Sequence, residues 1–158
     1  MTVENIPFTP EGYKELQKEL DNLKKIQRHK IIEAIAEARA HGDLKENAEY
    51  HAAREKQSFI EGRISLLEDK LSRAQVVNNE NLNTSTVRFG ALVTLLDEET
   101  DTEKKYRVVG DLEADISKNK ISLSSPIAKA ILGKNVDDEV AIRVPKGVKE
   151  YLIIKVEY

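Results

Sequence analysis

The residues best placed to do chemistry are two carboxylates, Asp43 and Glu46, in the segment from His41 to Asn47. Side chains three positions apart lie on the same side of a helical turn, so both carboxylates could converge on one cation. Two carboxylates supply too few of the ~6 oxygens that Mg²⁺ requires. The pair is therefore predicted to form an incomplete metal site that a partner must complete.

The same two residues also fit a purely structural pattern, the capping box at the start of a helix. In that pattern Asp43 accepts a hydrogen bond from the backbone N–H of the third helical residue, and Glu46 reaches back. Gly42 would end the preceding helix in a left-handed conformation. Helix capping is the commoner explanation of an isolated D-x-x-E after a glycine, so the surrounding sequence must decide.

The acidic segment interrupts two long helical patterns. Gly42 is the only glycine from residue 13 to residue 61, and no proline occurs between Pro10 and Pro126. Thr9-Pro10 is typical of a helix start, because threonine caps backbone donors and proline suits the first helical position. The connection at Gly42 is too short for anything but antiparallel neighbours, which predicts one helical hairpin.

Apolar residues spaced by three and four predict coiled-coil packing between the two helices. The outgoing pattern lapses at Gln27 and Lys30 and resumes at Ile31, which indicates a locally relaxed supercoil. The return helix carries two heptad rows, which are Ala53, Ile60, Leu67 and Ala74, and Gln57, Ile64 and Leu71. Near the reversal we expect small residues to face each other: Ala34, Ala36, Ala38, Ala40, Ala48, Ala52 and Ala53.

A polar stretch without periodicity, residues 78–86, separates the hairpin from a pattern of short strands. Strands are expected at 87–89, 91–96, 106–109, 121–123, 140–144 and 151–156, with an acidic hairpin loop at 97–103. One short helix should begin at Ser125-Pro126 and end at Gly133. The chain is thus predicted to be α+β, with an antiparallel coiled-coil hairpin over 1–77, a linker over 78–86 and a small antiparallel sheet domain over 87–158.

Composition limits the class of protein. The 158 residues include no cysteine and carry a net charge of −3, with acidic and basic residues shared evenly by the two halves. The basic excess that binding to free nucleic acid requires is missing. The sequence shows no secretory signal and no apolar run of ~18 residues, so we expect a cytoplasmic protein without membrane contact.

Other side chains near the reversal admit two interpretations each. His41 and His51 are more simply explained as solvated histidines at helix ends than as metal ligands. Arg39 and Arg54 could form ion pairs with nearby carboxylates or could hold a phosphate. Tyr50 could pack on the helices or stack on a base.

The segment Gly42 to Glu55, which reads GDLKENAEYHAARE, resembles the signature of the bacterial Gre transcript-cleavage factors of the GreA type. Residues 31–39, 109–115, 124–128 and 154–158 are similar to the same family. The resemblance therefore covers essentially the whole chain.

This resemblance implies a function and a partner. Gre factors bind an RNA polymerase that has backtracked and extruded the 3′ end of its RNA into the secondary channel. The coiled coil enters that channel, and its tip acids help to hold the second Mg²⁺ of the polymerase and orient a water, so that the polymerase hydrolyses its own transcript. By position, Asp43 and Glu46 are these acids, which share the metal with the polymerase, and the factor has no cofactor of its own.

The resemblance also implies the remaining contacts. Arg39 and Arg54 resemble members of the basic patch that touches the extruded RNA. The C-terminal domain, FKBP-like in fold, should dock on a coiled coil of the β′ subunit at the rim of the channel, with Ser125 and Pro126 in the docking region. We expect a monomer that stimulates the endonuclease activity of the polymerase and is not itself an enzyme.

Three other functions compete with this one. A Gre-like inhibitor would occupy the same channel but is expected to carry a more acidic tip, whereas Leu44 and Lys45 follow Asp43 here. A prolyl isomerase needs an aromatic-lined apolar pocket, and the second half of the chain is poor in aromatic residues. A structural scaffold would pair its helices between chains and would not be a monomer.

Overall fold

The computed structural model describes residues 4–158, which fall into two compact units. The first unit contains Glu11–Ala74, and the second contains Ile6–Pro10 together with Gln75–Tyr158. The limits predicted from the sequence, 1–77, 78–86 and 87–158, remain a prediction. Within the described residues, no helix combines the length and the apolar character that crossing a membrane demands.

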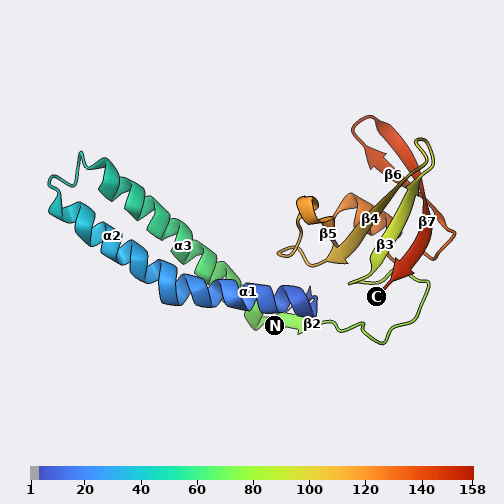
Figure 1. Cartoon of the computed structure of the whole chain (residues 1–158), viewed down its shortest axis with the longest axis horizontal. Coiled ribbons are helices and arrows are strands. Elements are labelled where there is room, and N and C mark those ends of the chain that lie inside the picture. The colour runs from blue at the N-terminus through green and yellow to red at the C-terminus, as the bar shows by residue number, and fades with distance from the viewer. Residues whose placement is uncertain (1–3) are drawn as a thin grey trace. The chain divides into compact units, whose positions relative to one another are not determined.

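The first unit is an antiparallel helical hairpin (Figure 1). Its outgoing arm consists of α1 (Pro10–Asn22), a π-helical segment η1 (Leu23–Gln27) and α2 (Arg28–Ala40), and its return arm is α3 (Ala48–Ser72). The π-helical segment lies where the apolar pattern lapses. Because a π-turn accommodates one extra residue, the apolar frame resumes at Ile31, one position later than a continued heptad would place it.

The two arms pack through a short apolar seam. Ile31 and Ile35 of α2 form one buried cluster with Ile60 and Ile64 of α3, which confirms the predicted coiled-coil packing. Farther along α3, Leu67 is fully buried. Partly buried residues pack against the cluster: Leu20, Leu23, Tyr50 and Ala53.

Ion pairs on the surface link the same two arms. Arg28 contacts Glu61 through two hydrogen bonds of 2.7 and 2.9 Å, and Arg63 contacts Glu19 through two of 2.7 and 3.1 Å. The hydrogen bonds from Arg28 lower the pKa of Glu61. These pairs are partly solvated, so they add little to stability.

The expected alanine seam near the reversal forms only in part. Ala38 is buried and Ala53 is half-buried. The other five alanines are exposed: Ala34, Ala36, Ala40, Ala48 and Ala52. Residues two apart on a helix point ~200° apart, so the alternating alanines of α2 cannot all share one face. The prediction was wrong for the five exposed alanines.

The second unit contains a five-stranded sheet in the order β5–β4–β3–β7–β6 (Figure 1). The strands are β3 (Leu92–Asp97), β4 (Thr102–Val109), β5 (Lys120–Ser122), β6 (Glu139–Val144) and β7 (Gly147–Glu157). Neighbouring strands are antiparallel except β4 and β5, which are parallel. The α+β class is confirmed, but the sheet is mixed, and the prediction of a purely antiparallel sheet was wrong. The parallel pair arises because the connection at 110–119, which includes the 3₁₀ helix η2 (Ile116–Lys118), carries the chain back before β5 begins.

Two short strands lie outside the five-stranded sheet. β1 (Ile6–Phe8) and β2 (Ala74–Val76) pair as a separate two-stranded sheet. Residues 87–89 were predicted to be a strand but lie outside the strands of the sheet. Val87 is buried there and donates its N–H to the carbonyl of Lys134 at 2.8 Å, so its backbone is satisfied without a strand neighbour.

One helix, α4 (Pro126–Ile131), supplies Ala128 and Ile131 to the core of the second unit. Both side chains are fully buried together with sheet residues such as Val93, Leu95 and Ile153. The predicted helix start is confirmed, because Ser125 is the N-cap and its Oγ accepts a hydrogen bond from the N–H of Ala128 at 3.2 Å. Gly133 follows the helix with φ +81°, a conformation that favours glycine.

Asp97 is a buried carboxylate at the turn between β3 and β4. Desolvation by burial is the largest single effect and raises its pKa. The hydrogen bonds from the N–H groups of Glu99 and Thr100 and the charge of Lys149 together lower the pKa by more than burial raises it, so the pKa of Asp97 lies below its usual value. The N–H groups of Glu99 and Thr100 lie 3.0 and 3.4 Å from Oδ1. A lowered pKa means that the stabilisation is present above the unfolded pKa of ~3.9 and is lost as the pH falls through the folded value.

Asp97→Asn is therefore expected to flatten the acid limb of the stability profile. Urea denaturation between pH 6 and pH 2 should show that the wild type loses stability more steeply below pH 4 than the variant does. Glu103→Gln, an exposed change on the neighbouring strand, is the control and should keep the wild-type slope. Equal acid slopes for Asp97→Asn and the wild type would contradict the assignment.

Candidate functional site

The tip of the hairpin is a turn over residues 41–47 between α2 and α3. Gly42 has φ +125°, a backbone conformation that glycine adopts readily and that residues with a Cβ atom disfavour. The chain leaves α2 through this glycine. Oδ1 of Asp43 accepts a hydrogen bond from the N–H of Lys45 at 3.0 Å, which closes a local turn. Asp43 and Glu46 are both exposed.

The N-cap of α3 is Asn47 and not Asp43. The Oδ1 atom of Asn47 accepts a hydrogen bond from the N–H of Tyr50 at 3.0 Å, and the helix begins at Ala48. Asp43 and Glu46 precede the helix, so the capping box considered from the sequence does not form. The prediction that both acids lie within one helical turn was also wrong, since residues 44–46 form a turn. Freed from capping, the two carboxylates are available to an external ligand.

The two acids share an open hollow at the end of the hairpin. It is lined by His41, Asp43, Glu46, Asn47, Ala48 and Glu49. Across residues 4–158, no group of three or more histidine, cysteine, aspartate or glutamate side chains could hold a metal ion. Asp43 and Glu46 have the donor chemistry that Mg²⁺ prefers but fall short of a complete shell.

The neighbours of the acids resolve some of the alternatives. The guanidinium of Arg39 lies 5.7 Å from the centroid of the Tyr50 ring, a cation–π distance. Tyr50 is half-buried against the isoleucine cluster and meets the His51 ring edge-on at 5.5 Å, which confirms a packing role. In the described part of the chain, no carboxylate forms an ion pair with Arg39 or Arg54, so the ion pairs considered from the sequence do not form there.

Two contacts at the tip were not predicted from the sequence. Nδ2 of Asn47 donates to the carbonyl of Ala38 at 2.7 Å, and Nε2 of His51 lies 3.1 Å from the carbonyl of Lys45. The asparagine was within reach of sequence reasoning, because Asn is among the best N-cap residues and stands directly before Ala48. The histidine contact joins a side chain of α3 to the backbone of the turn, and no spacing rule reveals it.

The remaining candidates, Ser125 and Pro126, lie in the second unit at the start of α4. Ser125 is half-buried by its capping role, and Pro126 is exposed at the first helical position. Their positions explain the helix start and leave Pro126 accessible on the surface.

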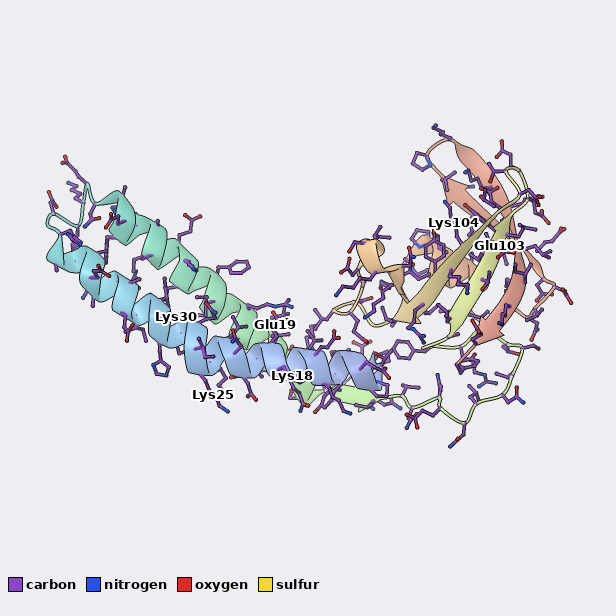
Figure 2. The ribbon with its side chains drawn as sticks, viewed as in Figure 1. Lys18, Glu19, Lys25, Lys30, Glu103 and Lys104 are labelled. Atoms are coloured by element: carbon purple, nitrogen blue, oxygen red, sulfur yellow. The ribbon has the colours of Figure 1, made fainter. Side chains whose placement is uncertain are left out.

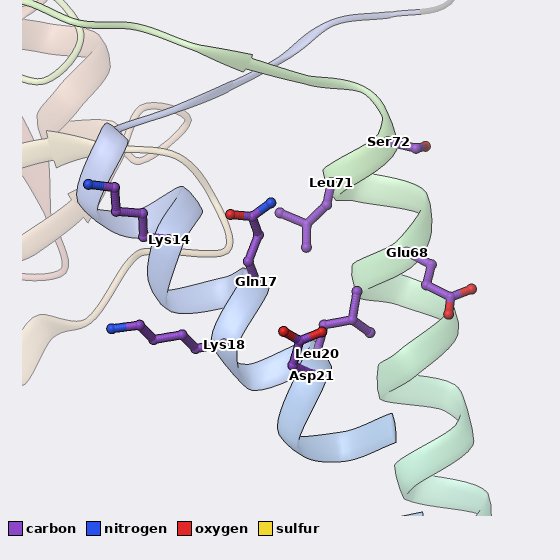
Figure 3. A pocket seen from close by; sticks show the side chains of 8 residues that line it. All are labelled: Lys14, Gln17, Lys18, Leu20, Asp21, Glu68, Leu71 and Ser72. Carbon is purple, nitrogen blue, oxygen red and sulfur yellow. The ribbon is translucent and has the colours of Figure 1, made fainter. Parts of the chain in front are cut away.

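A second hollow lies between α1 and the end of α3 (Figure 3). It is lined by Lys14, Gln17, Lys18, Leu20, Asp21, Glu68, Leu71 and Ser72. Its charges are of both signs, and Glu68 is engaged by Lys24 at 3.0 Å. The exposed side chain of Lys25 extends away from the outgoing arm (Figure 2). This hollow contains none of the candidate residues.

The structure shows a class of protein with two exposed carboxylates in the turn of a helical hairpin and a second unit built on a five-stranded sheet. Two family models match it: "Transcription elongation factor, N-terminal" over residues 6–76 and "Transcription elongation factor, GreA/GreB, C-term" over residues 82–158. The chain belongs to the GreA/GreB family of transcription elongation factors.

Curated relatives agree with this assignment. The chain is 56% identical over 156 residues to Transcription elongation factor GreA of Hyphomonas neptunium, with 99% of each chain covered. It is 54% identical over 152 residues to the protein of the same name from Rickettsia prowazekii, with 96% of this chain and 94% of the relative covered. These relatives confirm the family predicted from the tip segment and support transcription elongation over the inhibitor alternative.

Two solved structures align with nearly the whole chain. GreA factor homolog 1 of Thermus thermophilus is 27% identical with a TM-score of 0.45, covering 98% of this chain and 100% of its own. The GreA/GreB factor of Nitrosomonas europaea is 23% identical with a TM-score of 0.45, covering 99% and 100%.

Proposed function

We propose that this transcription elongation factor binds RNA polymerase that has backtracked and stimulates the polymerase's own Mg²⁺-dependent cleavage of the extruded RNA 3′ end. The observation that carries the proposal is the state of the tip acids. Asp43 and Glu46 are exposed and lie in a turn at the end of a hairpin, and neither is the N-cap of α3. Such a pair is suited to a metal site that another protein completes.

The two carboxylates would act as ligands to a Mg²⁺ ion that the polymerase also holds. When bound, a second metal of this kind stabilises the attacking and leaving oxygens of an in-line displacement. Asp43 is oriented for this role by the N–H of Lys45, which occupies Oδ1 and leaves Oδ2 available. The factor then contributes ligands and not a complete active site, and the reaction belongs to the polymerase.

The test is a cleavage assay on stalled elongation complexes with labelled RNA. Added protein should shorten the RNA from its 3′ end at neutral pH with Mg²⁺. Polymerase alone should cleave slowly, and protein alone should leave free RNA intact. Cleavage of free RNA by the factor would show an enzyme in its own right and overturn this part of the proposal.

Arg39 and Arg54 are proposed to contact the extruded RNA. Neither forms an ion pair with a carboxylate of residues 4–158, so both guanidinium groups remain available to a phosphate. The Tyr50 ring limits the freedom of Arg39, which lowers the entropy lost on binding.

Arg54→Ala is expected to slow cleavage by about threefold to tenfold, the range for loss of one charge-assisted phosphate contact. The loss should shrink as salt rises, because salt already weakens the wild-type contact. Lys56→Ala, also exposed on α3, is the matched control. Equal cleavage by Arg54→Ala and Lys56→Ala at low salt would remove Arg54 from the RNA-binding role.

The second unit is proposed to dock on the coiled coil of the β′ subunit at the rim of the secondary channel. Pro126 is exposed and Ser125 is held by α4, so the two present a fixed surface at the helix start. We further propose that the factor acts as a monomer in the cytoplasm, since the isoleucines of α2 and α3 bury one another within a single hairpin.

A further inference from the structure

We propose that Asn47 and His51 are positioning residues that hold the tip acids in place for cleavage. This inference rests on the proposed function and adds a pre-organised turn to it. Asn47 joins the two arms of the hairpin directly below the tip, and His51 joins the turn to α3.

The contacts of Asn47 require an amide side chain. Its Nδ2 donates to a carbonyl of α2, that of Ala38, at 2.7 Å, and its Oδ1 accepts from an N–H of α3, that of Tyr50, at 3.0 Å. The first partner is an acceptor and the second is a donor, so a carboxylate can satisfy only one of them. The carbonyl of Ala38 lies in the last turn of α2 and also accepts from the N–H of His41 at 3.2 Å, so the Asn47 amide is a second donor to it. Asn47 therefore fastens the end of one helix to the start of the other.

The contact of His51 reaches Asp43 through the backbone of Lys45. Nε2 of His51 lies 3.1 Å from the Lys45 carbonyl and must carry the hydrogen, because a carbonyl oxygen only accepts. The N–H of the same Lys45 donates to Oδ1 of Asp43 at 3.0 Å. The Asp43 carboxylate is thus connected to the rigid helix α3 by two successive hydrogen bonds.

Glu46 lies between these two anchored positions. Its neighbours Lys45 and Asn47 are each fixed by side-chain hydrogen bonds, while Glu46 itself is exposed. The backbone of Glu46 is therefore held while its carboxylate stays available. Misplacing a catalytic ligand by ~1 Å can cost on the order of 100-fold in rate, so this support matters for the reaction.

We call the hydrogen bonds of Asn47 and His51 around the tip the clamp. Asn47→Asp tests this clamp without removing the N-cap of α3. Aspartate keeps the acceptor for the Tyr50 N–H and is as good an N-cap as asparagine, but it places an acceptor opposite the Ala38 carbonyl. We expect the cleavage rate at saturating factor to fall by about tenfold or more. The factor concentration that gives half-maximal cleavage should change by less than about twofold, because docking uses the other unit. Ser58→Ala, exposed in the middle of α3, is the matched control and should behave as the wild type.

A pair of changes tests His51 in the same assay. His51→Leu loses the donor and should slow cleavage, whereas His51→Gln can present an amide N–H near the same place and should restore most of the rate. If His51 only stabilised the helix, His51→Leu and His51→Gln should cleave at similar rates, because the position is exposed and neither side chain would be buried there.

Amide hydrogen exchange of the free protein separates this inference from the proposed function. Asn47→Asp should raise exchange at the Lys45 amide by at least about fivefold, whether or not the protein acts on polymerase. Wild-type exchange and wild-type cleavage in Asn47→Asp would overturn the clamp. Normal cleavage after loss of Asp43 would instead overturn the proposed function and leave the clamp, as measured by exchange, in place.

Discussion

Converting both tip acids to their amides, Asp43→Asn with Glu46→Gln, is expected to abolish stimulated cleavage. The amides match the carboxylates in shape but lose both negative charges, so they bind Mg²⁺ far more weakly. Loss of one well-placed electrostatic group in an active site costs ~10²–10³ in rate, and two such losses at one metal should reach at least ~100-fold. The expected readout is the single-turnover rate of RNA shortening at saturating factor.

The fold of the double variant should be unchanged. Both side chains are exposed, and the amide that replaces the Asp43 carboxylate retains an oxygen that can accept from the Lys45 N–H. The variant should therefore compete with the wild-type factor for polymerase and inhibit cleavage when added in excess. Such competition would distinguish lost chemistry from lost docking.

Glu55→Gln provides the matched control, because Glu55 is an exposed carboxylate on α3 outside the tip hollow. It should cleave at the wild-type rate. Raising the Mg²⁺ concentration should partly restore cleavage by the single variant Glu46→Gln, since a weakened site fills at higher metal concentration. A double variant that trims RNA at the wild-type rate would show that the tip acids are not metal ligands.

The hairpin could be predicted because its determinants are local. The absence of glycine and proline from residues 13–41 and 43–61 and the spacing of apolar residues specify helices without knowledge of the fold. Even the lapse near Gln27 corresponds to a physical feature, the π-helical segment η1. The predicted alanine seam forms only in part, because alanine content alone does not say which face of a helix each alanine occupies. Only Ala38 and Ala53 are buried or half-buried.

The second unit shows where strand patterns stop being informative. The strands themselves follow from β-branched and aromatic runs, but the pattern does not say which strands pair or in which direction. The parallel pairing of β4 with β5 depends on the path of residues 110–119, and that path is set by tertiary packing. Val87 illustrates the same limit, because a buried apolar residue with a satisfied N–H need not belong to a strand.

The assignment of Asp43 and Glu46 as site residues remains a prediction, and the residues that hold the turn around them were not predicted from the sequence. The resemblance assigned Asp43 and Glu46, while spacing alone left helix capping as the commoner explanation. The structure places the cap at Asn47, one residue beyond the acidic pair. Asp, Glu and Asn so close together all satisfy capping preferences, so the local pattern cannot choose among them.

The arm that carries the tip should depend strongly on Leu67, which is fully buried in α3. Leu67→Ala is expected to destabilise the hairpin by about 3 kcal/mol, the middle of the range for a buried leucine that leaves a cavity. For a domain of this size the midpoint of thermal unfolding should fall by roughly 10–20 °C. Circular dichroism at 222 nm reports this unit selectively, because the long helices α1, α2 and α3 all belong to it.

The adjacent leucine supplies the comparison that isolates burial. Leu66 is 38% exposed, so Leu66→Ala makes the same side-chain change one position earlier and should cost less than about 1 kcal/mol. Helix propensity favours alanine equally at both positions and cancels in the difference. A hairpin whose stability came from helix propensity and surface ion pairs would respond alike to the two changes. A difference of about 2 kcal/mol or more between them would establish that the burial of Leu67 stabilises the hairpin that carries Asp43 and Glu46.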